Sequence, residues 1–325
     1  MWPRVTALGL LIAFTAVVLP ARGQVASGFP AKPVKFIIPF PGGGINDVLA
    51  RIAADKLTAK WGQPIVVENK TGAGGNIGAD FAAQAEPDGH TLFVTPPGPL
   101  AVNQSLYRQL SYRPEDFVPV TVLAAVTNLI IARPEIGVNS VMELIAFAKQ
   151  NPGKVTYGSQ GNGSTPHLTG SMFMTMTGVR MIHVPYRGEN LVINDMLGGH
   201  VDVFFGNIAP VLPHYRDGKL KVLAVADVKR AASIPDVPTA AEAGLPGFVS
   251  TSWFAVAGPP KMPPELAQRL AADFADVLRM PNVQTKYRSV GAEPVATTPP
   301  ETAAFVEAEA ARWREVITKN NIRIE

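Results

Sequence analysis

Three glycine-rich loops hold the residues of this sequence whose types and spacing suggest binding chemistry. The first follows an apolar run over residues 34–40, which predicts a buried strand because it is nearly continuous. The run ends in P-G-G-G at 41–44, and a helix is expected from about Asn46 and Asp47, two common capping residues. This order presents backbone N–H groups and a positive dipole end to an anion, although a tight turn without a ligand fits it equally well.

The other two loops repeat this arrangement. Residues 71–78 read T-G-A-G-G-N-I-G and open a second predicted helix that reaches residue 85. Residues 158–167 read G-S-Q-G-N-G-S-T-P-H and precede a helix expected over 166–177, so hydroxyl groups lie at its N-terminus. Of the five histidines, His167 is the one that we place near a ligand, with a structural role as the alternative.

Catalytic and metal-binding signatures are missing from the sequence. No serine lies in G-x-S-x-G, no phosphate-binding G-x-x-x-x-G-K-[ST] loop occurs, and Ile77 stands at the third glycine of a dinucleotide fingerprint. The absence of cysteine excludes thiol catalysis and thiolate metal sites. Asp47 and Asp202 are candidates for an acid–base pair, but a helix cap and a loop anchor explain them better. We therefore expect no enzyme activity, no catalytic residue and no cofactor.

Composition indicates a packed globular protein without affinity for nucleic acid. The chain has 325 residues, 47% of them hydrophobic and 17% charged, which is enough for two domains. Residues 1–23 combine Arg4, an apolar run and small residues at 21–23, which is typical of a signal peptide cleaved before Gln24. A membrane anchor is the alternative, but the run is short for one. Without Arg4 and Arg22 the formal charge falls from +3 to +1, so no basic surface for nucleic acid is expected.

Strands and helices alternate along the chain, which predicts an α/β fold with parallel sheets. A βαβαβ unit covers the first third, Ser140 is expected to cap a helix through residue 150, and a second βαβ region spans roughly 133–250. The apolar stretches 120–132 and 251–257 are expected to cross between two lobes. The predicted division gives residues 24–128 and 253–325 to lobe 1 and 129–252 to lobe 2, with a ligand cleft between them.

Eight segments of the sequence together resemble one known family. They are P-F-P-G-G-G-I-N-D-V-L-A-R, V-V-E-N-K-T-G-A-G-G-N-I-G-A, Y-G-S-Q-G-N-G-S-T-P-H-L-T-G, H-V-P-Y-R-G, L-G-G-H-V-D-V-F-F-G-N, G-K-L-K-V-L-A-V, I-P-D-V-P-T-A-A-E-A-G-L-P-G-F and S-W-F-A-V-A-G-P-P. In this order they resemble the Bug family of solute-binding proteins, the extracytoplasmic receptors of tripartite tricarboxylate transporters, over about residues 30–322.

The resemblance implies a type II periplasmic-binding-protein fold, in which two α/β lobes close on a small carboxylate. In the family, loops after the first strands of each lobe hold the carboxylates, helped by ordered water. Carried onto this sequence, the ligand-binding residues are Phe40, Pro41, Gly43, Gly44, Asn46, Asp47, Gly75, Asn76, Ser159, Ser164, Thr165, His167, Tyr186 and Asn207. No lysine or arginine is required, because helix N-termini and hydroxyl groups hold anions.

Three departures from the family pattern bear on the ligand. Gly42 and Ile45-Asn46 alter the first loop, which commonly reads P-P-G-G-G-T-D. Glu189 follows H-V-P-Y-R-G where small residues are usual, and Gly206 stands where an aspartate often precedes the asparagine. Loss of an acidic group at 206 favours a more negative or bulkier ligand, whereas Glu189 near the cleft favours an amine or a hydroxyl. Ligand identity therefore stays open.

The resulting hypothesis is a periplasmic receptor for a mono-, di- or tricarboxylate, aromatic ones included. It delivers its ligand to the large and small membrane subunits of a tripartite tricarboxylate transporter and acts as a monomer. The alternatives are a sensor that presents its ligand to a membrane signalling partner such as a sensor kinase, and an exported hydrolase, which the missing nucleophile–base pair disfavours.

Overall fold

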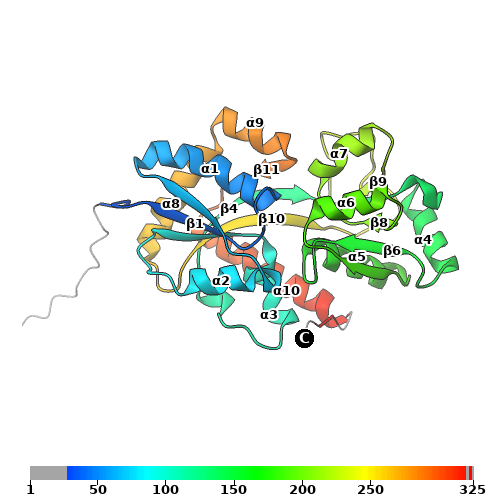
Figure 1. Cartoon of the computed structure of the whole chain (residues 1–325), viewed down its shortest axis with the longest axis horizontal. Coiled ribbons are helices and arrows are strands. Elements are labelled where there is room, and N and C mark those ends of the chain that lie inside the picture. The colour runs from blue at the N-terminus through cyan, green and yellow to red at the C-terminus, as the bar shows by residue number, and fades with distance from the viewer. Residues whose placement is uncertain (1–27, 320–321, 324–325) are drawn as a thin grey trace, which may run out of the picture.

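The computed structural model describes residues 28–319 and 322–323, so the predicted signal peptide lies outside the described residues. The elements gather into two lobes along the long axis of the molecule (Figure 1). Each lobe is built on its own β-sheet, one of six strands and one of five. Within the described residues, no helix is both long and apolar enough to cross a membrane.

The six-stranded sheet has the order β11-β4-β10-β3-β1-β2. Its strands are β1 (Val34–Ile38), β2 (Ile65–Asn69), β3 (Thr91–Thr95), β4 (Val118–Thr127), β10 (Thr251–Gly258) and β11 (Ala292–Pro294). Its helices are α1 (Ile45–Trp61), α2 (Asn76–Ala83), α3 (Asn103–Leu106), α8 (Pro264–Leu278), α9 (Pro281–Ser289) and α10 (Pro299–Lys319). Short helical turns lie at Ala73–Gly75, Gly98–Val102 and Pro114–Asp116.

The five-stranded sheet has the order β7-β6-β8-β5-β9. Its strands are β5 (Leu129–Ala132), β6 (Thr156–Ser159), β7 (Ile182–Pro185), β8 (Val203–Phe204) and β9 (Lys221–Val225). Its helices are α4 (Val141–Gln150), α5 (Thr165–Thr177), α6 (Glu189–Leu197) and α7 (Ile208–Arg216), with a 3-10 turn at Pro134–Ile136. Ser140 caps α4 as expected, since its side chain accepts from the Glu143 N–H at 3.1 Å.

Helices cover both faces of each sheet. In the first lobe, α1, α8 and α9 pack apolar side chains such as Leu49, Phe274 and Tyr287 onto one face. The other face is covered by α2 and α10, which bury Ala79 and Trp313. In the second lobe, α4 and α5 cover one face, and α6 and α7 cover the other. These apolar layers fix the sheets, and the sheets in turn fix where the loops begin.

Both sheets are mixed rather than purely parallel, which corrects the prediction from the sequence. The pairs β1–β2, β1–β3, β6–β7 and β6–β8 are parallel as expected. However, β10 is antiparallel to β3 and β4, and β5 is antiparallel to β8 and β9. The cause is the pair of crossing segments, because a chain that arrives from the other lobe enters the sheet against the direction of its neighbours. The stretch 120–132 accordingly forms two strands, β4 and β5, which belong to different sheets.

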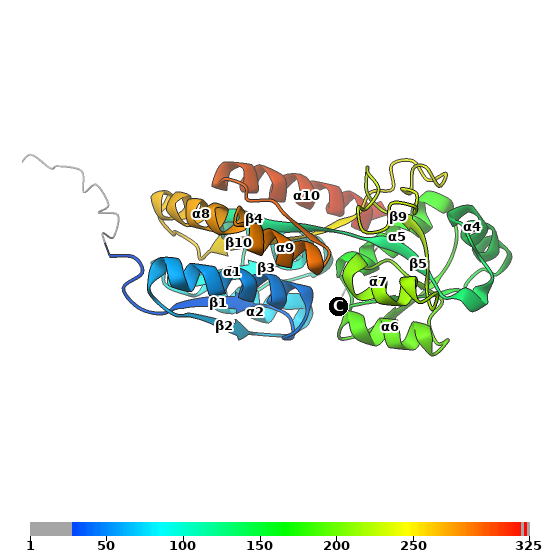
Figure 2. The ribbon, with the colours of Figure 1, turned by 90° about the horizontal axis from the view of Figure 1, so that it is seen from above.

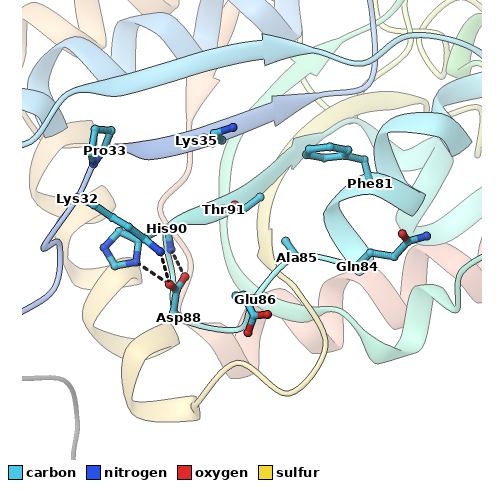
Figure 3. Close-up of a pocket in the computed structure, with 10 residues that line it drawn as sticks. All are labelled: Lys32, Pro33, Lys35, Phe81, Gln84, Ala85, Glu86, Asp88, His90 and Thr91. Carbon is cyan, nitrogen blue, oxygen red and sulfur yellow. Dashed lines mark hydrogen bonds and ion pairs between the residues drawn. The ribbon is translucent and has the colours of Figure 1, made fainter.

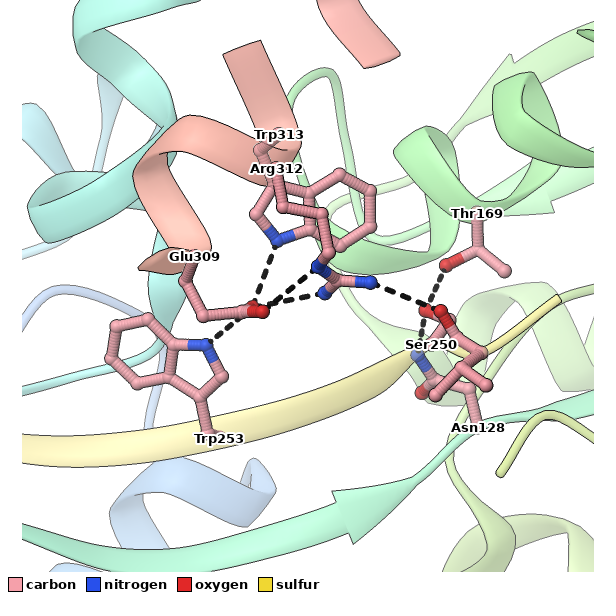
Figure 4. A network of polar contacts seen from close by, with 8 residues as sticks. Asn128, Thr169, Ser250, Trp253, Glu309, Arg312 and Trp313 are labelled. Atoms are coloured by element: carbon pink, nitrogen blue, oxygen red, sulfur yellow. Dashed lines mark hydrogen bonds and ion pairs between the residues drawn. The ribbon is translucent and has the colours of Figure 1, made fainter. Parts of the chain in front are cut away.

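The two crossings lie side by side. Asn128, between β4 and β5, donates its N–H to Ser250 O at 3.3 Å and accepts from Ala226 N–H at 2.9 Å. Its side chain donates to Ser250 Oγ at 3.0 Å, and Ser250 Oγ lies 2.5 Å from Thr169 Oγ1 of α5 (Figure 4). Asn128, Thr169 and Ser250 are all buried. A small polar cluster therefore ties the crossings to the second lobe.

Helix α10 also reaches from the first lobe toward the second (Figure 2). Glu309 accepts hydrogen bonds from Arg312 and from the indole N–H groups of Trp253 and Trp313 (Figure 4). Arg312 donates in addition to Val249 O at 3.0 Å, in the segment that leads from the second lobe into β10. Glu309 and Arg312 therefore link α10 to the second crossing.

Candidate ligand-binding site

The strand directions place the carboxyl ends of β1, β2 and β3 in one lobe opposite those of β6, β7 and β8 in the other. Because β10 is antiparallel to β3 and β4, β4 points the same way as β3 and leads through Asn128 directly into β5. Since β5 is antiparallel to β8, and β8 is parallel to β6, the carboxyl ends of β6, β7 and β8 point back toward the first lobe. The loops after β1, β2 and β3 therefore face those after β6, β7 and β8, and ligands of parallel sheets bind at such ends.

Asp47 holds the loop after β1 in place. Its buried carboxylate accepts from Gly43 N–H at 3.0 Å, from Asn69 Nδ2 at 3.1 Å, and from two nitrogens of Arg51 at 2.9 Å each. Burial alone would raise the pKa of Asp47, but the hydrogen bonds from Arg51, Gly43 and Asn69 outweigh it and lower the pKa. All hydrogen bonds of the Asp47 carboxylate are made within the lobe, so Asp47 holds the loop that includes Gly43 and Gly44. Residues 41–44 of this loop are exposed.

Helix α1 begins at Ile45, after Gly44 as N-cap. Val48 N–H makes the first helical bond to Gly44 O, at 3.0 Å, which leaves the N–H groups of residues 45–47 outside the helical ladder. Asn46 is buried, and its Nδ2 donates to Val94 O at 3.0 Å. Its Oδ1 is buried without a partner among the described residues. Leaving such an acceptor unpaired costs about 1–3 kcal/mol.

The second loop presents the amide of Asn76. Its Oδ1 accepts from Asn103 Nδ2 at 2.6 Å and from Tyr112 Oη at 2.9 Å. These two donors fix the amide, so that Nδ2 is the group left for a ligand. The loop is closely packed, because a Cβ on Gly75 would lie 2.9 Å from Pro99 Cγ and 3.2 Å from Pro39 Cβ, and the φ of Gly75 is +94°. Phe40 lies within 3.4 Å of the same point.

In the third loop, Ser159 and Ser164 shape the backbone. The Ser159 hydroxyl accepts from Gly161 N–H at 3.0 Å and lies 2.7 Å from His183 Nε2. Ser164 donates to Gly161 O at 2.7 Å and serves as N-cap of α5. Both hydroxyls are therefore used within the loop. They act by positioning the residues that follow them.

His167 and Thr165 are the groups of this loop with hydrogen-bonding capacity left. His167 Nδ1 accepts from Gly163 N–H at 3.1 Å, so the ring proton resides on Nε2. Burial lowers the pKa of His167 to about 4, and burial together with the adjacent His167 lowers that of His183 to about 3, so both rings are neutral. Thr165 is the first residue of α5, and its hydroxyl has no partner among the described residues.

Tyr186 lies in the loop after β7. Its N–H donates to Ser159 O at 2.9 Å, and its hydroxyl donates to Asp195 Oδ2 at 2.6 Å. Burial and the carboxylate of Asp195 raise the pKa of Tyr186 to about 12. The hydroxyl is thus committed to α6, and the partly buried ring is the part of Tyr186 left to contact a ligand.

Asn207 is joined to Glu189. The Asn207 N–H donates to Glu189 Oε1 at 2.9 Å, and Nδ2 donates to Oε2 at 3.0 Å. Asn207 is the N-cap of α7, and its Oδ1 is buried without a partner among the described residues. Although Glu189 keeps partial solvent access, burial raises the pKa of its carboxyl to about 7, against the lowering effect of hydrogen bonds from Asn207 and Gln160.

The packing around Gly206 explains why this chain has no aspartate at that position. A Cβ at this position would collide with the ring of Phe204, which is fully buried in the core of the second lobe. An aspartate here would therefore require that ring to move. Glu189 supplies an acidic group to Asn207 from α6 instead.

The pH dependence of stability tests the environment of Glu189. The pKa of its carboxyl rises from 4.5 to about 7 on folding, so the charged form favours the unfolded state. We expect the wild type to lose stability, relative to Glu189→Gln, as the pH rises from about 4.5 to about 7, and to show no further change above that. Urea unfolding at pH 5, 6, 7 and 8 measures the difference. A difference that stays constant over this pH range would contradict it.

The geometry brings fourteen predicted residues onto two facing edges but gives them different roles. The loop after β1 includes Phe40, Pro41, Gly43, Gly44, Asn46 and Asp47; Gly75 and Asn76 follow β2; Ser159, Ser164, Thr165 and His167 follow β6; Tyr186 follows β7; and Asn207 follows β8. The sequence reasoning missed the positioning residues Asn103, Tyr112, His183 and Asp195. Their contacts join residues that are 9 (Tyr186 and Asp195) to 36 (Asn76 and Tyr112) positions apart, and no local pattern signals them.

A surface hollow of about 580 Å³ lies elsewhere, beside the amino ends of β1 and β3 (Figure 3). Its two lysines pair with acidic side chains, in Lys32–Asp88 at 3.0 Å and Lys35–Glu68 at 3.0 Å. Because ligands of parallel sheets bind at the opposite ends of the strands, we do not place the site there. Among the described residues, no group of three or more His, Asp or Glu side chains is arranged to hold a metal.

Two lobes on separate sheets, joined by adjacent crossings and with uncharged donors on facing edges, define the class of two-lobed solute-binding receptors. A family model described as "Tripartite tricarboxylate transporter family receptor" matches residues 49–322. The chain belongs to this family. Its members and its structural neighbours are solute-binding receptors, which confirms the expectation that the protein is not an enzyme.

Individual relatives agree with this assignment. Protein BugT of Bordetella pertussis is 36% identical over 320 residues, which is 98% of this chain and 97% of the relative. A structure of R. palustris Rpa4515 with adipate is 38% identical at a TM-score of 0.85, and covers 91% of this chain and 100% of its own. The structure of MatC from Rhodopseudomonas palustris with bound malate is 32% identical in sequence, with a TM-score of 0.82. The match covers 89% of this chain and 100% of that chain. The structure of the periplasmic binding protein BugD is also 32% identical, with a TM-score of 0.82. It covers 91% of this chain and 100% of its own.

Proposed function

We propose that the protein captures a small carboxylate between the facing loops of its lobes. The observation that carries this proposal is the set of neutral donors there, namely Asn76 Nδ2, Thr165 Oγ1, His167 Nε2 and the N-terminal N–H groups of α1 and α5. Such donors hold a carboxylate without a counter-charge. The proposed ligand is a mono-, di- or tricarboxylate, aromatic ones included, and relatives solved with the dicarboxylates adipate and malate support carboxylate binding.

The same proposal gives the remaining candidate residues their roles. Backbone groups of Gly43, Gly44 and Gly75 approach the ligand closely, and Phe40, Pro41 and the ring of Tyr186 contact its carbon atoms. Asp47, Ser159 and Ser164 hold the loops in position. Lobe 1 comprises residues 24–128 and 253–325 and lobe 2 comprises 129–252, with the hinge at the crossings beside Asn128.

The protein acts in the periplasm as a monomer, after cleavage before Gln24, and delivers its ligand to the large and small membrane subunits of a tripartite tricarboxylate transporter. Its family and the periplasmic location of a relative such as BugD support this. A pull-down from membranes with the tagged, ligand-loaded protein tests the partner. Recovery of a sensor kinase instead of transporter subunits would favour the signalling alternative.

A thermal-shift panel tests the ligand class. It contains aliphatic dicarboxylates, citrate, amino acids, nicotinate and benzene carboxylates. A ligand at 100 times its Kd adds about 2.7 kcal/mol to the unfolding free energy, which raises Tm by several degrees. We expect one or more carboxylates to do so. A panel without any shift, repeated after unfolding and refolding to remove bound ligand, would contradict carboxylate binding.

Thr165→Val tests the site itself. The substitution keeps the shape of the side chain but removes the free hydroxyl at the start of α5, so one ligand oxygen loses its donor. We expect the affinity for the best ligand of the panel to fall by about 1–3 kcal/mol, or roughly 5- to 150-fold, without a change in fold. Isothermal titration calorimetry measures this. The matched control is Thr177→Val at the other end of α5, and equal affinities of the two variants would place the ligand elsewhere.

A further inference from the structure

Each lobe carries one buried side-chain oxygen that lacks a partner at the candidate site. Asn46 and Asn207 are only 4% and 3% exposed, and neither Oδ1 meets a donor among the described residues. Asn46 follows β1 in the first lobe and Asn207 follows β8 in the second, so both lie on the facing edges. A buried acceptor without a donor is unfavourable, so a ligand that brings a donor gains affinity there.

Both amides are fixed with the oxygen as the remaining group. Asn46 Nδ2 donates to Val94 O at 3.0 Å. Asn207 Nδ2 donates to Glu189 Oε2 at 3.0 Å, while the Asn207 N–H donates to Oε1 at 2.9 Å. Because each NH2 group already has an acceptor, rotating either amide would break a hydrogen bond. The atoms that the two side chains offer to a ligand are therefore acceptors.

Glu189 also occupies a position that would otherwise attract an anion. Asn207 is the N-cap of α7, and a helix N-terminus favours negative charge. In this chain the carboxylate of Glu189 supplies that charge from within the protein. A second ligand carboxylate at this place would meet an amide oxygen and a carboxylate, and it has no proton to donate to either.

We propose that Glu189 is a specificity-determining residue: by holding Asn207 it makes this end of the second lobe accept hydrogen bonds, so that the preferred ligand is a carboxylate that also carries a hydroxyl or an ammonium group. The inference rests on the proposed function, since it concerns the groups of the ligand other than the carboxylate held at the helix N-termini. It adds a requirement that those helix N-termini do not impose.

Glu189→Gln is expected to narrow or reverse the preference for a ligand with a hydroxyl or ammonium group. The amide of glutamine offers one oxygen and one NH2 group where glutamate offers two oxygens. Asn207 can accept from that NH2 group only by turning its amide over, and its own Nδ2 then points toward the ligand. The variant therefore presents a donor where the wild type presents an acceptor. A second carboxylate on the ligand then gains a hydrogen bond from Asn207, and a hydroxyl or ammonium group loses its acceptor.

Calorimetry on matched ligands tests this at pH 8, where Glu189 is charged. The probes are three sets that differ only in the donor: succinate, malate and aspartate; adipate, 2-hydroxyadipate and 2-aminoadipate; propionate, lactate and alanine. We expect a donor-bearing member to bind at least about ten-fold more tightly than its plain counterpart, which is about 1.4 kcal/mol. Glu189→Gln should narrow or reverse this ratio, and the exposed control Glu86→Gln should leave it unchanged.

Each outcome decides a separate point. Tighter binding of the plain carboxylates by the wild type, or an unchanged ratio in Glu189→Gln, would overturn the inference while leaving carboxylate binding intact. Failure of every probe to bind folded wild-type protein would overturn the proposed function itself. If Glu189→Gln does not fold, the ranking by the wild type still decides. A crystal structure with the best probe then shows whether its hydroxyl or ammonium group lies within hydrogen-bond distance of Asn207 Oδ1.

Discussion

Replacing Glu309 with alanine will lower the free energy of unfolding by about 3–5 kcal/mol, because two indole N–H groups lose their acceptor at about 1–3 kcal/mol each and the half-buried Arg312 loses its partner. The carboxylate accepts from Trp253 Nε1 at 2.9 Å, from Trp313 Nε1 at 3.1 Å, and from Arg312 Nε and Nη2 at 2.8 and 2.9 Å. The indole rings belong to residues only 1% and 0% exposed, so alanine leaves both N–H groups buried without an acceptor. Arg312 would also lose the carboxylate that orients it toward Val249 O.

Urea unfolding followed by tryptophan fluorescence measures this effect, because two of the four tryptophans are partners of Glu309. Glu307→Ala, on the same helix but exposed, is the matched control and should change stability by no more than about 0.5 kcal/mol. A loss below about 1 kcal/mol in Glu309→Ala would mean that the network adds little to stability. Since Arg312 joins α10 to the second crossing through Val249 O, the variant should also weaken this hydrogen-bonded link between the two lobes.

The sequence was sufficient to predict the elements whose signals are local. The glycine loop at 41–44, followed by Asn46 and Asp47, predicts the strand–loop–helix unit, and α1 begins at Ile45. Ser140 likewise marks the start of α4. In contrast, the stretch 120–132 resembles one long strand, and only the polar pair Thr127-Asn128 marks where β4 ends and β5 begins. Pro210 and Pro213 disfavour a helix interior, yet residues 208–216 form α7.

The candidate site divides in the same way. Loop position and residue type predict that Asn76, Thr165 and Asn207 lie near a ligand. They do not show which atoms remain available, because this depends on partners distant in sequence. Glu189 lies 18 residues from Asn207, and Asn103 lies 27 residues from Asn76. Only the folded chain shows that Asn76 offers a donor whereas Asn207 offers an acceptor.

Asp47→Ala is expected to impair stability and ligand binding together. The carboxylate of Asp47 is 5% exposed, but its partner Arg51 is 52% exposed, so water compensates part of the loss. We therefore expect the unfolding free energy to fall by about 2–3 kcal/mol, less than for a fully buried pair. Gly43 N–H would lose its acceptor, and the loop before α1 would no longer be held in one conformation. Ligand affinity should fall by about ten-fold, because binding must then order this loop.

The pH dependence separates the charge of Asp47 from its packing. Because the pKa of Asp47 in the folded protein lies below its ordinary value of 3.8, the charged carboxylate contributes its full stabilisation above about pH 4, and this is lost as the pH falls through the lower, folded value. The stability difference between the wild type and Asp47→Asn should therefore shrink below pH 4. Asp55→Ala, an exposed site on the same helix, should leave ligand affinity unchanged. If Asp47→Ala lowered the unfolding free energy but not the ligand affinity, the loop after β1 would be only a structural turn. The carboxylate of the ligand would then have to bind through the N-terminal ends of α2 and α5 alone.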